Sequence, residues 1–450
     1  MARATTTTMS SPRAVGERNA LPLDAIALLL PFARLIELRI VGNLYLHDVL
    51  TPIVILFLFQ QPVSLRPLRP LIILLGIWLF GAVASDVYRH SPFNDYARGW
   101  SKIVLFGLNA VMVWMLTGGQ SRRLAVYTFS TGIALCMGAL LKPVELDATD
   151  PWKFGLGYGV ALTLTAIATS SAVQRRLGQY VGSWMLGAVA LVSMLQNSRS
   201  LFAICALAAI YSPVARWISS RPALSRRLTP TIFFGFILAG LLAGQALVGG
   251  YGALAQGGVL GQDAQTKFLD QTKGNLNFLQ GGRTESLVSL EAIKDSPILG
   301  HGSWAKDPYY LQLLLVKLRD AGLPAPGTFY DIGVKTEFII PTHSYLFGAW
   351  VENGILGIPI WIYAFFLAFQ SLYAIIKVRG QPSALLSLVA FAMMWDVFFS
   401  PFAADARILK GLEVCILIAV ADALRGLRVT NAPRGAGPRP MTGNVRQRPI

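Results

Sequence analysis

The most regular feature of the chain is a succession of apolar runs separated by short polar segments. Most runs approach the roughly 20 residues that a helix needs to cross the ~30 Å hydrocarbon core of a bilayer. The predicted spans are 22–38, 48–61, 70–86, 101–117, 122–141, 154–172, 181–196, 199–217, 230–250, 355–377, 383–400 and 405–424. The pattern therefore predicts an all-α polytopic membrane protein with about twelve transmembrane helices.

Polar residues interrupt this succession most strongly between the ninth and tenth runs. Within this long loop, apolar spacing predicts one helix over Arg283–Ser296 and a second over Asp307–Leu318. The predicted divisions are an N-terminal tail at 1–20, helices one to nine within 21–250, a large helical loop at 251–342, a re-entry segment with helices ten to twelve at 343–425, and a disordered basic tail at 426–450.

Basic residues alternate with the predicted helices. With the N-terminus placed in the cytoplasm, every inner loop carries at least two Lys or Arg residues, whereas the outer loop Lys142–Lys153 balances its lysines with carboxylates. Lysine and arginine collect in cytoplasmic loops. The charge pattern therefore predicts that both termini are cytoplasmic and that the large loop 251–342 lies outside.

Composition agrees with a membrane protein and narrows the classes of partner. The chain is 54% hydrophobic and 14% charged, whereas ordinary soluble domains carry about 25% charged residues. The net charge of +16 is explained by basic loops and tails, so we expect membrane lipids and no nucleic acid as partners. The three cysteines lie in apolar runs and are expected as small buried hydrophobes. We find no pattern typical of a metal or nucleotide cofactor site.

The chain has four histidines, and their positions make some of them better candidates for catalysis than others. His343 lies where the large loop re-enters the membrane, and a neutral histidine at this boundary can accept a proton near pH 7. Its alternative role is an interfacial anchor. His47 and His90, near the outer ends of predicted helices, are expected to be solvated, and His301 lies in a glycine-flanked turn.

Two arginines are candidates for binding an anion at the outer face. Arg199 lies in the very short turn Gln196–Ser200 between two predicted helices, and Arg283 begins the first loop helix. The planar guanidinium binds phosphate oxygens in a bidentate manner, which suits a phosphate or pyrophosphate. The alternatives are snorkelling to the interface and, for Arg283, an ion pair with Glu285.

Three segments, in this order, resemble the O-antigen ligase and O-antigen polymerase superfamily of bacterial membrane glycosyltransferases. They are Asn197–Ser200 opening a helix, Arg283 followed by Pro297–Gly302, and His343–Leu346 followed by Glu352, Gly354 and Gly357. The number of predicted helices and the large loop before the histidine also resemble this superfamily. His301 stands where the superfamily usually has an apolar residue, so we carry no function onto it.

The resemblance implies an enzyme of the bacterial inner membrane whose site faces the periplasm. Its donor would be a glycan on undecaprenyl pyrophosphate, its acceptor a glycolipid or glycan, and it would need neither a metal nor another cofactor. Arg199 and Arg283 would hold the pyrophosphate, and His343 would orient or deprotonate the acceptor hydroxyl, with inversion at the anomeric carbon. Tyr345 and Glu352 would support the site.

Several functions remain open at this point. One large outer loop favours a ligase acting on lipid A-core, because polymerases of this superfamily often have two sizeable periplasmic loops. An O-antigen or exopolysaccharide polymerase is the nearest alternative. A lipid-linked oligosaccharide flippase belongs to another class, although transporters usually show internal repeats, which are not evident here. A structural membrane subunit would explain the hydropathy, but it would not explain why the two arginines and the histidine occur in this order.

Overall fold

The computed structural model describes residues 20–39, 42–141, 150–237, 285–323, 327–378 and 383–431, together with a few isolated residues between 239 and 265. Within these ranges the chain is almost entirely helical, which confirms the predicted all-α class. The only sheet in the described chain is a short antiparallel hairpin of β1 (Glu37–Arg39) and β2 (Asn43–Tyr45). Sequence analysis did not predict this hairpin.

The N-terminal part of the helix bundle combines long helices with several short ones. They are α1 (Ala20–Leu29), η2 (Leu30–Leu35), α2 (Leu46–Leu58), η3 (Arg66–Leu68), α3 (Arg69–Arg89), α4 (Phe93–Thr117), α5 (Ser121–Leu141), the π-turn η4 (Trp152–Leu156), α7 (Gly157–Ala168), α8 (Ser171–Leu177), α9 (Val181–Leu195), α10 (Arg199–Ser220) and α11 (Pro222–Arg227).

The remainder of the described chain contributes the loop helices and the last long helices. They are α15 (Glu285–Asp295), α16 (Pro308–Asp320), α17 (Phe329–Thr336), α18 (Tyr345–Asn353), η5 (Gly354–Gly357), α19 (Pro359–Lys377), α20 (Ser383–Phe399) and α21 (Ala406–Asn431). The helix α21 continues past residue 426, where the sequence predicted the tail to begin.

Five helices of the described chain are long and apolar enough to cross a membrane. They are α4, α5, α10, α19 and α3 with the turn η3 that precedes it. Counting the bent pair Trp152–Ala168 and Ser171–Leu177 as one broken span raises the number to six in the part of the chain described. The protein is therefore membrane-embedded by the length and composition of these helices.

The predicted count of about twelve spans is not confirmed. Eleven of the twelve predicted segments coincide with helices or pieces of helices, but α2, α9 and α20 have only 13, 15 and 17 residues. The helix α21 is long but carries Arg407, Lys410 and Glu413 near its start. Most of the segment 230–250 lies outside the described residues.

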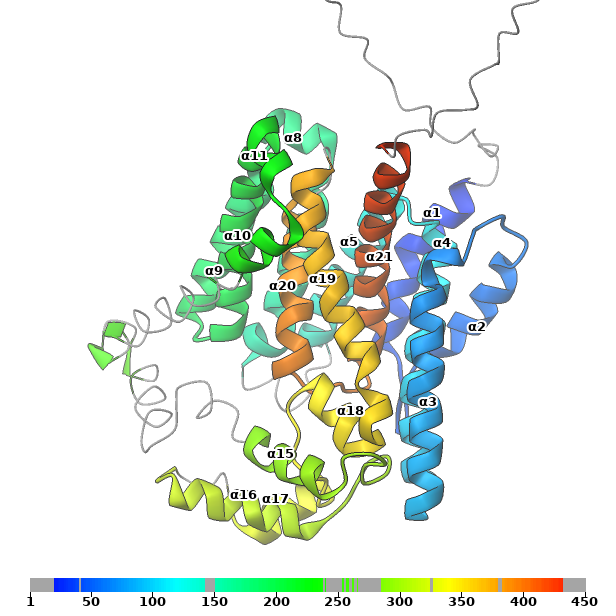
Figure 1. Ribbon diagram of the computed structural model, residues 1–450, viewed down its shortest axis with the longest axis vertical. Helices are drawn as coiled ribbons and strands as arrows, with labels where there is room; N and C mark the ends of the chain where they lie inside the picture. The colour runs from blue at the N-terminus through cyan, green and yellow to red at the C-terminus, as the bar shows by residue number, and fades with distance from the viewer. Residues whose placement is uncertain are drawn as a thin grey trace, which may run out of the picture.

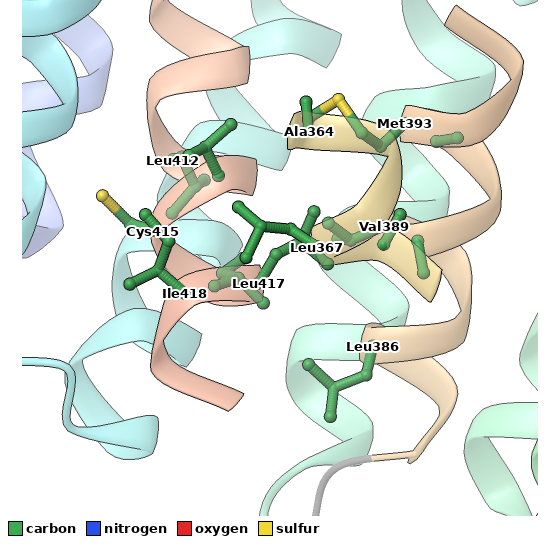
Figure 2. Packing of buried hydrophobic residues seen from close by; sticks show 14 of the residues in the cluster. Ala364, Leu367, Leu386, Val389, Met393, Leu412, Cys415, Leu417 and Ile418 are labelled. Carbon is green, nitrogen blue, oxygen red and sulfur yellow. The ribbon is translucent and has the colours of Figure 1, made fainter. Parts of the chain in front are cut away.

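A hydrophobic core joins the long helices through large aliphatic side chains. Figure 2 shows its centre, where Leu367 of α19, Val389 of α20 and Leu417 of α21 point toward one another. Helix α20 also packs against α10, and α21 packs against α4. The core therefore ties together helices from both ends of the sequence.

The loop helices α15, α16 and α17 lie across one end of the bundle (Figure 1). We call these helices, with the described residues that join them to one another and to α18, the cap. Their positions confirm the two helices predicted in the large loop, while α17 was not predicted. A separate apolar cluster that includes Val288, Tyr310, Leu314 and Val351 joins the cap to α18. Helices α8 and α11 and the end of α21 lie at the opposite end of the bundle (Figure 1).

Candidate functional site

His343 lies in the extended segment that joins the cap to α18, and its side chain is half-buried. The next residue, Ser344, fixes this segment in two directions. Its hydroxyl accepts a hydrogen bond from the backbone N–H of Phe347 (3.1 Å), which caps α18, and donates one to the carbonyl of Val397 (2.8 Å). His343 is thereby attached to the end of α20 as well as to α18.

A cluster of buried charges lies next to this attachment point. Lys410 of α21 donates to Asp396 Oδ2 at 2.6 Å and to Glu413 Oε2 at 2.5 Å, and Tyr158 of α7 donates to Glu413 Oε1 at 2.6 Å. We call these four residues the charge cluster. Lys410 and Glu413 are only 2% and 0% exposed, so each charge depends on its partner within the apolar bundle.

Asp396 is the most accessible of the three charged residues in the charge cluster. Its side chain is 19% exposed, and it directly precedes Val397, whose carbonyl holds Ser344. Ser400 donates a 2.5 Å hydrogen bond to the other carboxylate oxygen, Oδ1. The arrangement holds a partly accessible carboxylate beside the segment that carries His343.

Tyr345 lies between this segment and the aromatic core. Its ring is 4.8 Å from that of Trp361 and 5.1 Å from that of Phe402, and the Lys410 ammonium is 6.0 Å from its centre. The residue is 3% exposed. Tyr345 therefore packs α18 against the aromatic core and the charge cluster.

Arg199 is the first residue of α10, which begins on the cap side and runs to α11 at the opposite end of the bundle (Figure 1). Its Nε donates a 3.4 Å hydrogen bond to Asn197 Oδ1. Two residues on, Leu201 packs tightly against Gly157, the neighbour of Tyr158 in the charge cluster. Helix α10 also packs against α20, the helix that carries Asp396.

Arg283 lies outside the described residues, so its relation to Arg199 and His343 is untested. Among the other predicted site residues, the structure brings His343 and Tyr345 together at the start of α18. It places Arg199 on a helix that packs against α20, the helix to which Ser344 is bonded.

Glu352 has a structural partner. Its Oε2 accepts a 2.8 Å hydrogen bond from Lys102 of α4, and both side chains are largely buried. Its backbone carbonyl accepts hydrogen bonds from Ser85 and from the N–H of Gly302. Glu352 therefore fastens the end of α18 to α3, α4 and the cap.

The second and third segments of the family resemblance pack directly against each other. The His301 N–H donates to the Val351 carbonyl at 2.8 Å, and the Ile355 N–H donates to the Ile298 carbonyl at 3.1 Å. A Cβ atom on Gly354 would lie 1.9 Å from the Ile298 oxygen, and the φ of Gly354 is +65°. The glycine is required here because two backbones touch at a left-handed residue.

The expectation that His47 is solvated is wrong. His47 is 0% exposed, and its Nε2 is 2.8 Å from the hydroxyl of Tyr127. The adjacent Asp48 pairs with Arg407 of α21 at 2.5 Å and accepts from Asn109. These bonds fix α2 to α4, α5 and α21, so His47 belongs to a buried structural network.

An ion-pair group fastens the cap to the start of α4. Lys306 bonds to Asp95 at 2.9 Å and to Glu337 at 3.0 Å, and Arg98 approaches Glu337 at 3.5 Å. The Lys306 hydrogen bond holds the pKa of Glu337 below its usual value, against the opposing effect of burial. Partial burial opposes protonation of Lys306, but its bonds to Asp95 and Glu337 nevertheless raise its pKa.

Sequence reasoning missed the charge cluster. Asp396, Lys410 and Glu413 lie within apolar runs, and ionisable residues inside a membrane span indicate a functional or structural site. The sequence therefore contained a signal for these three charged residues, but it gave no sign that Tyr158 pairs with one of them. Among the described residues, no group of three or more His, Cys, Asp or Glu side chains could hold a metal ion.

Comparison with known proteins does not identify the chain. No protein-family model matches it, and the search of curated proteins found no match.

Proposed function

We propose that this chain is a membrane glycosyltransferase that moves a glycan from undecaprenyl pyrophosphate to an acceptor sugar, acting as an O-antigen ligase on lipid A-core. The observation that carries the proposal is the Ser344–Val397 hydrogen bond of 2.8 Å. It joins the histidine segment beneath the cap to the end of α20, where Asp396 begins the charge cluster. The family resemblance supplies the substrate class.

The proposed reaction is a single displacement at the anomeric carbon. The acceptor oxygen forms the new bond to this carbon, while the bond from the carbon to the pyrophosphate oxygen breaks. His343 takes the proton of the acceptor hydroxyl. The bonding electrons leave with undecaprenyl pyrophosphate, whose charge Arg199 and Arg283 stabilise. Asp396 keeps its carboxylate bonded to Lys410 and Ser400 and thereby holds the end of α20 beside the segment that carries His343.

We propose that the cap lies in the periplasm and that both termini are cytoplasmic. The basic residues of α8 and α11 support this orientation, because they lie at the same end of the bundle as the end of α21 (Figure 1). Basic residues collect on the cytoplasmic side of membrane proteins. The cap then stands on the side where a lipid-linked glycan would meet its acceptor, in the inner membrane of a bacterium.

A polymerase would use the same chemistry with a second lipid-linked glycan as acceptor. In the described residues, the proposed periplasmic end of the bundle carries one cap. A single cap favours one large acceptor-binding region, and this in turn favours the ligase. The two enzymes differ in product. A ligase yields one glycan joined to lipid A-core, whereas a polymerase yields a ladder of longer lipid-linked chains or an exopolysaccharide.

The charge cluster also supports a second candidate function, a lipid-linked oligosaccharide transporter. Paired acidic and basic residues within a membrane often mark a proton or substrate pathway. In a transporter, Asp396, Lys410 and Glu413 would exchange partners as the protein changes conformation. In the glycosyltransferase, they hold α7, α20 and α21 in one arrangement throughout the reaction.

Cells carrying His343→Ala separate the two functions. The glycosyltransferase predicts that the lipid-linked donor accumulates on the outer face while its export continues. The matched control is His90→Asn, which alters an exposed histidine at the end of α3, where φ is +54° and asparagine is tolerated. Donor accumulation on the cytoplasmic side would instead support the transporter.

A further inference from the structure

A large cavity in the described part of the chain lies away from His343, at the opposite end of the bundle. It measures about 1200 Å³ and is lined by the terminal turns of α5, α7, α10, α19 and α20, together with Leu28 of α1. This is the end at which Figure 1 shows α8 and α11. Because membrane-crossing helices end here, the cavity lies at the depth of lipid headgroups.

One part of the cavity wall is polar and carries a cation. Arg216 of α10 donates to the Ser383 hydroxyl at 2.7 Å and to the Gln179 carbonyl at 2.6 Å. Both acceptors are neutral, and within the described chain Arg216 has no carboxylate partner. Hydroxyl groups of Ser170 and Ser219 line the same cavity. This wall therefore offers a fixed positive charge and several hydrogen-bond donors.

The wider charge environment of the cavity leaves Arg216 uncompensated. Arg122 also lines the cavity but pairs with Asp24 at 3.6 Å, and Asp24 further accepts a bond from Arg123. Among the described residues, no carboxylate lines the cavity itself. An anion is the ligand that this wall favours, because the guanidinium is already oriented by two neutral acceptors.

Another part of the cavity wall is apolar. Its side chains include Val126 and Phe129 of α5, Ile167 of α7 and Ile375 of α19. A small hydrated anion would leave this surface exposed to water, whereas an acyl chain would cover it. The cavity thus combines a charged end with an apolar wall at headgroup depth.

We propose that this cavity binds an anionic phospholipid of the adjacent leaflet, with its phosphate on Arg216 and an acyl chain against the apolar wall. The bound lipid would join helices from both halves of the sequence. Ligands that bind only the folded state stabilise it by mass action. The lipid therefore stabilises the fold, independently of the proposed enzymatic function.

The test measures lipid binding to the full-length protein in phosphatidylcholine nanodiscs with added phosphatidylglycerol, by native mass spectrometry and thermal unfolding. Phosphatidylglycerol is expected to remain bound to the wild-type protein and to raise its unfolding temperature. Arg216→Gln should weaken this binding about five- to tenfold, and Arg216→Lys should weaken it less. The control Arg227→Gln removes an exposed charge of α11 at the same end and should have no such effect.

A second variant tests the cavity without changing its charge. Ser219→Trp places a large ring in the cavity and should also abolish retention of phosphatidylglycerol. This variant keeps the proposal testable even if Arg216→Gln does not fold. Wild-type protein that retains phosphatidylcholine equally well would overturn the proposal. Unchanged binding in Arg216→Gln or Ser219→Trp would overturn it too. Inorganic phosphate that stabilises the protein and displaces the lipid would show that the site takes a soluble anion instead.

Discussion

The hydroxyl of Ser344 donates a 2.8 Å hydrogen bond to the carbonyl of Val397. These residues are the immediate neighbours of His343 and Asp396, and 53 positions separate them in the sequence. The bond connects the segment that carries His343 to the end of α20, which carries Asp396. The proposed function depends on this connection.

Replacing Ser344 should loosen the histidine segment without removing the histidine. Ser344→Ala removes both the bond to Val397 and the cap of α18, at a combined cost of about 1–3 kcal/mol. We expect a lower unfolding temperature and a reduced rate of glycan transfer. Ser344→Thr retains the hydroxyl and should keep most of both properties, and equal behaviour of the alanine and threonine variants would show that the bond is unimportant.

Removing the cation of the charge cluster should destabilise the bundle strongly. Lys410→Met leaves Asp396 and Glu413 buried without their partner, which typically costs about 3–5 kcal/mol. The matched control is the triple variant Lys410→Met, Asp396→Asn, Glu413→Gln, which removes all three charges and should recover much of the lost stability. Thermal unfolding in detergent measures the stability of both variants. A triple variant no more stable than Lys410→Met would contradict the assignment of the loss to unpaired charge.

The junction between the cap and the end of α18 should not tolerate a side chain at Gly354. Alanine there meets the Ile298 carbonyl and adopts a left-handed conformation, at a cost of about 2–5 kcal/mol. Gly76 of α3 is the control, since a Cβ atom there meets nothing within 4 Å and alanine favours a helix. Comparable unfolding temperatures for Gly354→Ala and Gly76→Ala would argue against the close backbone contact.

Attachment of the cap to α4 should weaken in acid. The pKa of Glu337 is lowered in the folded protein by its bond to Lys306. Its contribution to stability is therefore present above the unfolded pKa of about 4.3 and is lost as pH falls through the folded pKa. The pKa of Lys306 is raised, so its own contribution persists through neutral pH and is lost only as pH rises through its folded pKa.

Limited proteolysis of the cap at pH 7, 4 and 3 measures this dependence. Cleavage should accelerate as pH falls in the wild-type protein, and Glu337→Gln should already be more easily cleaved at pH 7 and show a smaller further change. Identical pH profiles for the two proteins would mean that Glu337 does not hold the cap.

The amino-acid sequence predicts the long apolar helices well, and their packing partners poorly. The helices α3, α5 and α10 and the cap helices α15 and α16 follow from runs and spacing of apolar residues, because burial dictates the local pattern. The helix α17 is short and mostly exposed, so it carries too weak a pattern. The count of twelve spans is not confirmed, since hydropathy alone does not separate a crossing helix from a shorter buried one.

The candidate site was predicted only in part for a related reason. His343 and Tyr345 are neighbours in the chain, so their association is local. Tyr158 and Glu413 lie 255 positions apart, and no local pattern relates them. His47 resembled a solvated histidine because its partner Tyr127 comes from a distant helix. Contacts of this kind depend on how the helices pack, which hydropathy does not encode.

The most direct test of the central claim is glycan transfer by the purified protein in liposomes, with undecaprenyl-pyrophosphate glycan, lipid A-core and no added metal. The wild-type protein should release undecaprenyl pyrophosphate and form glycan joined to lipid A-core. His343→Ala should be slower by about 10²–10⁴-fold, and His90→Asn should match the wild type. Absence of transfer by the wild-type protein, or equal rates with His343→Ala, would contradict the proposed function.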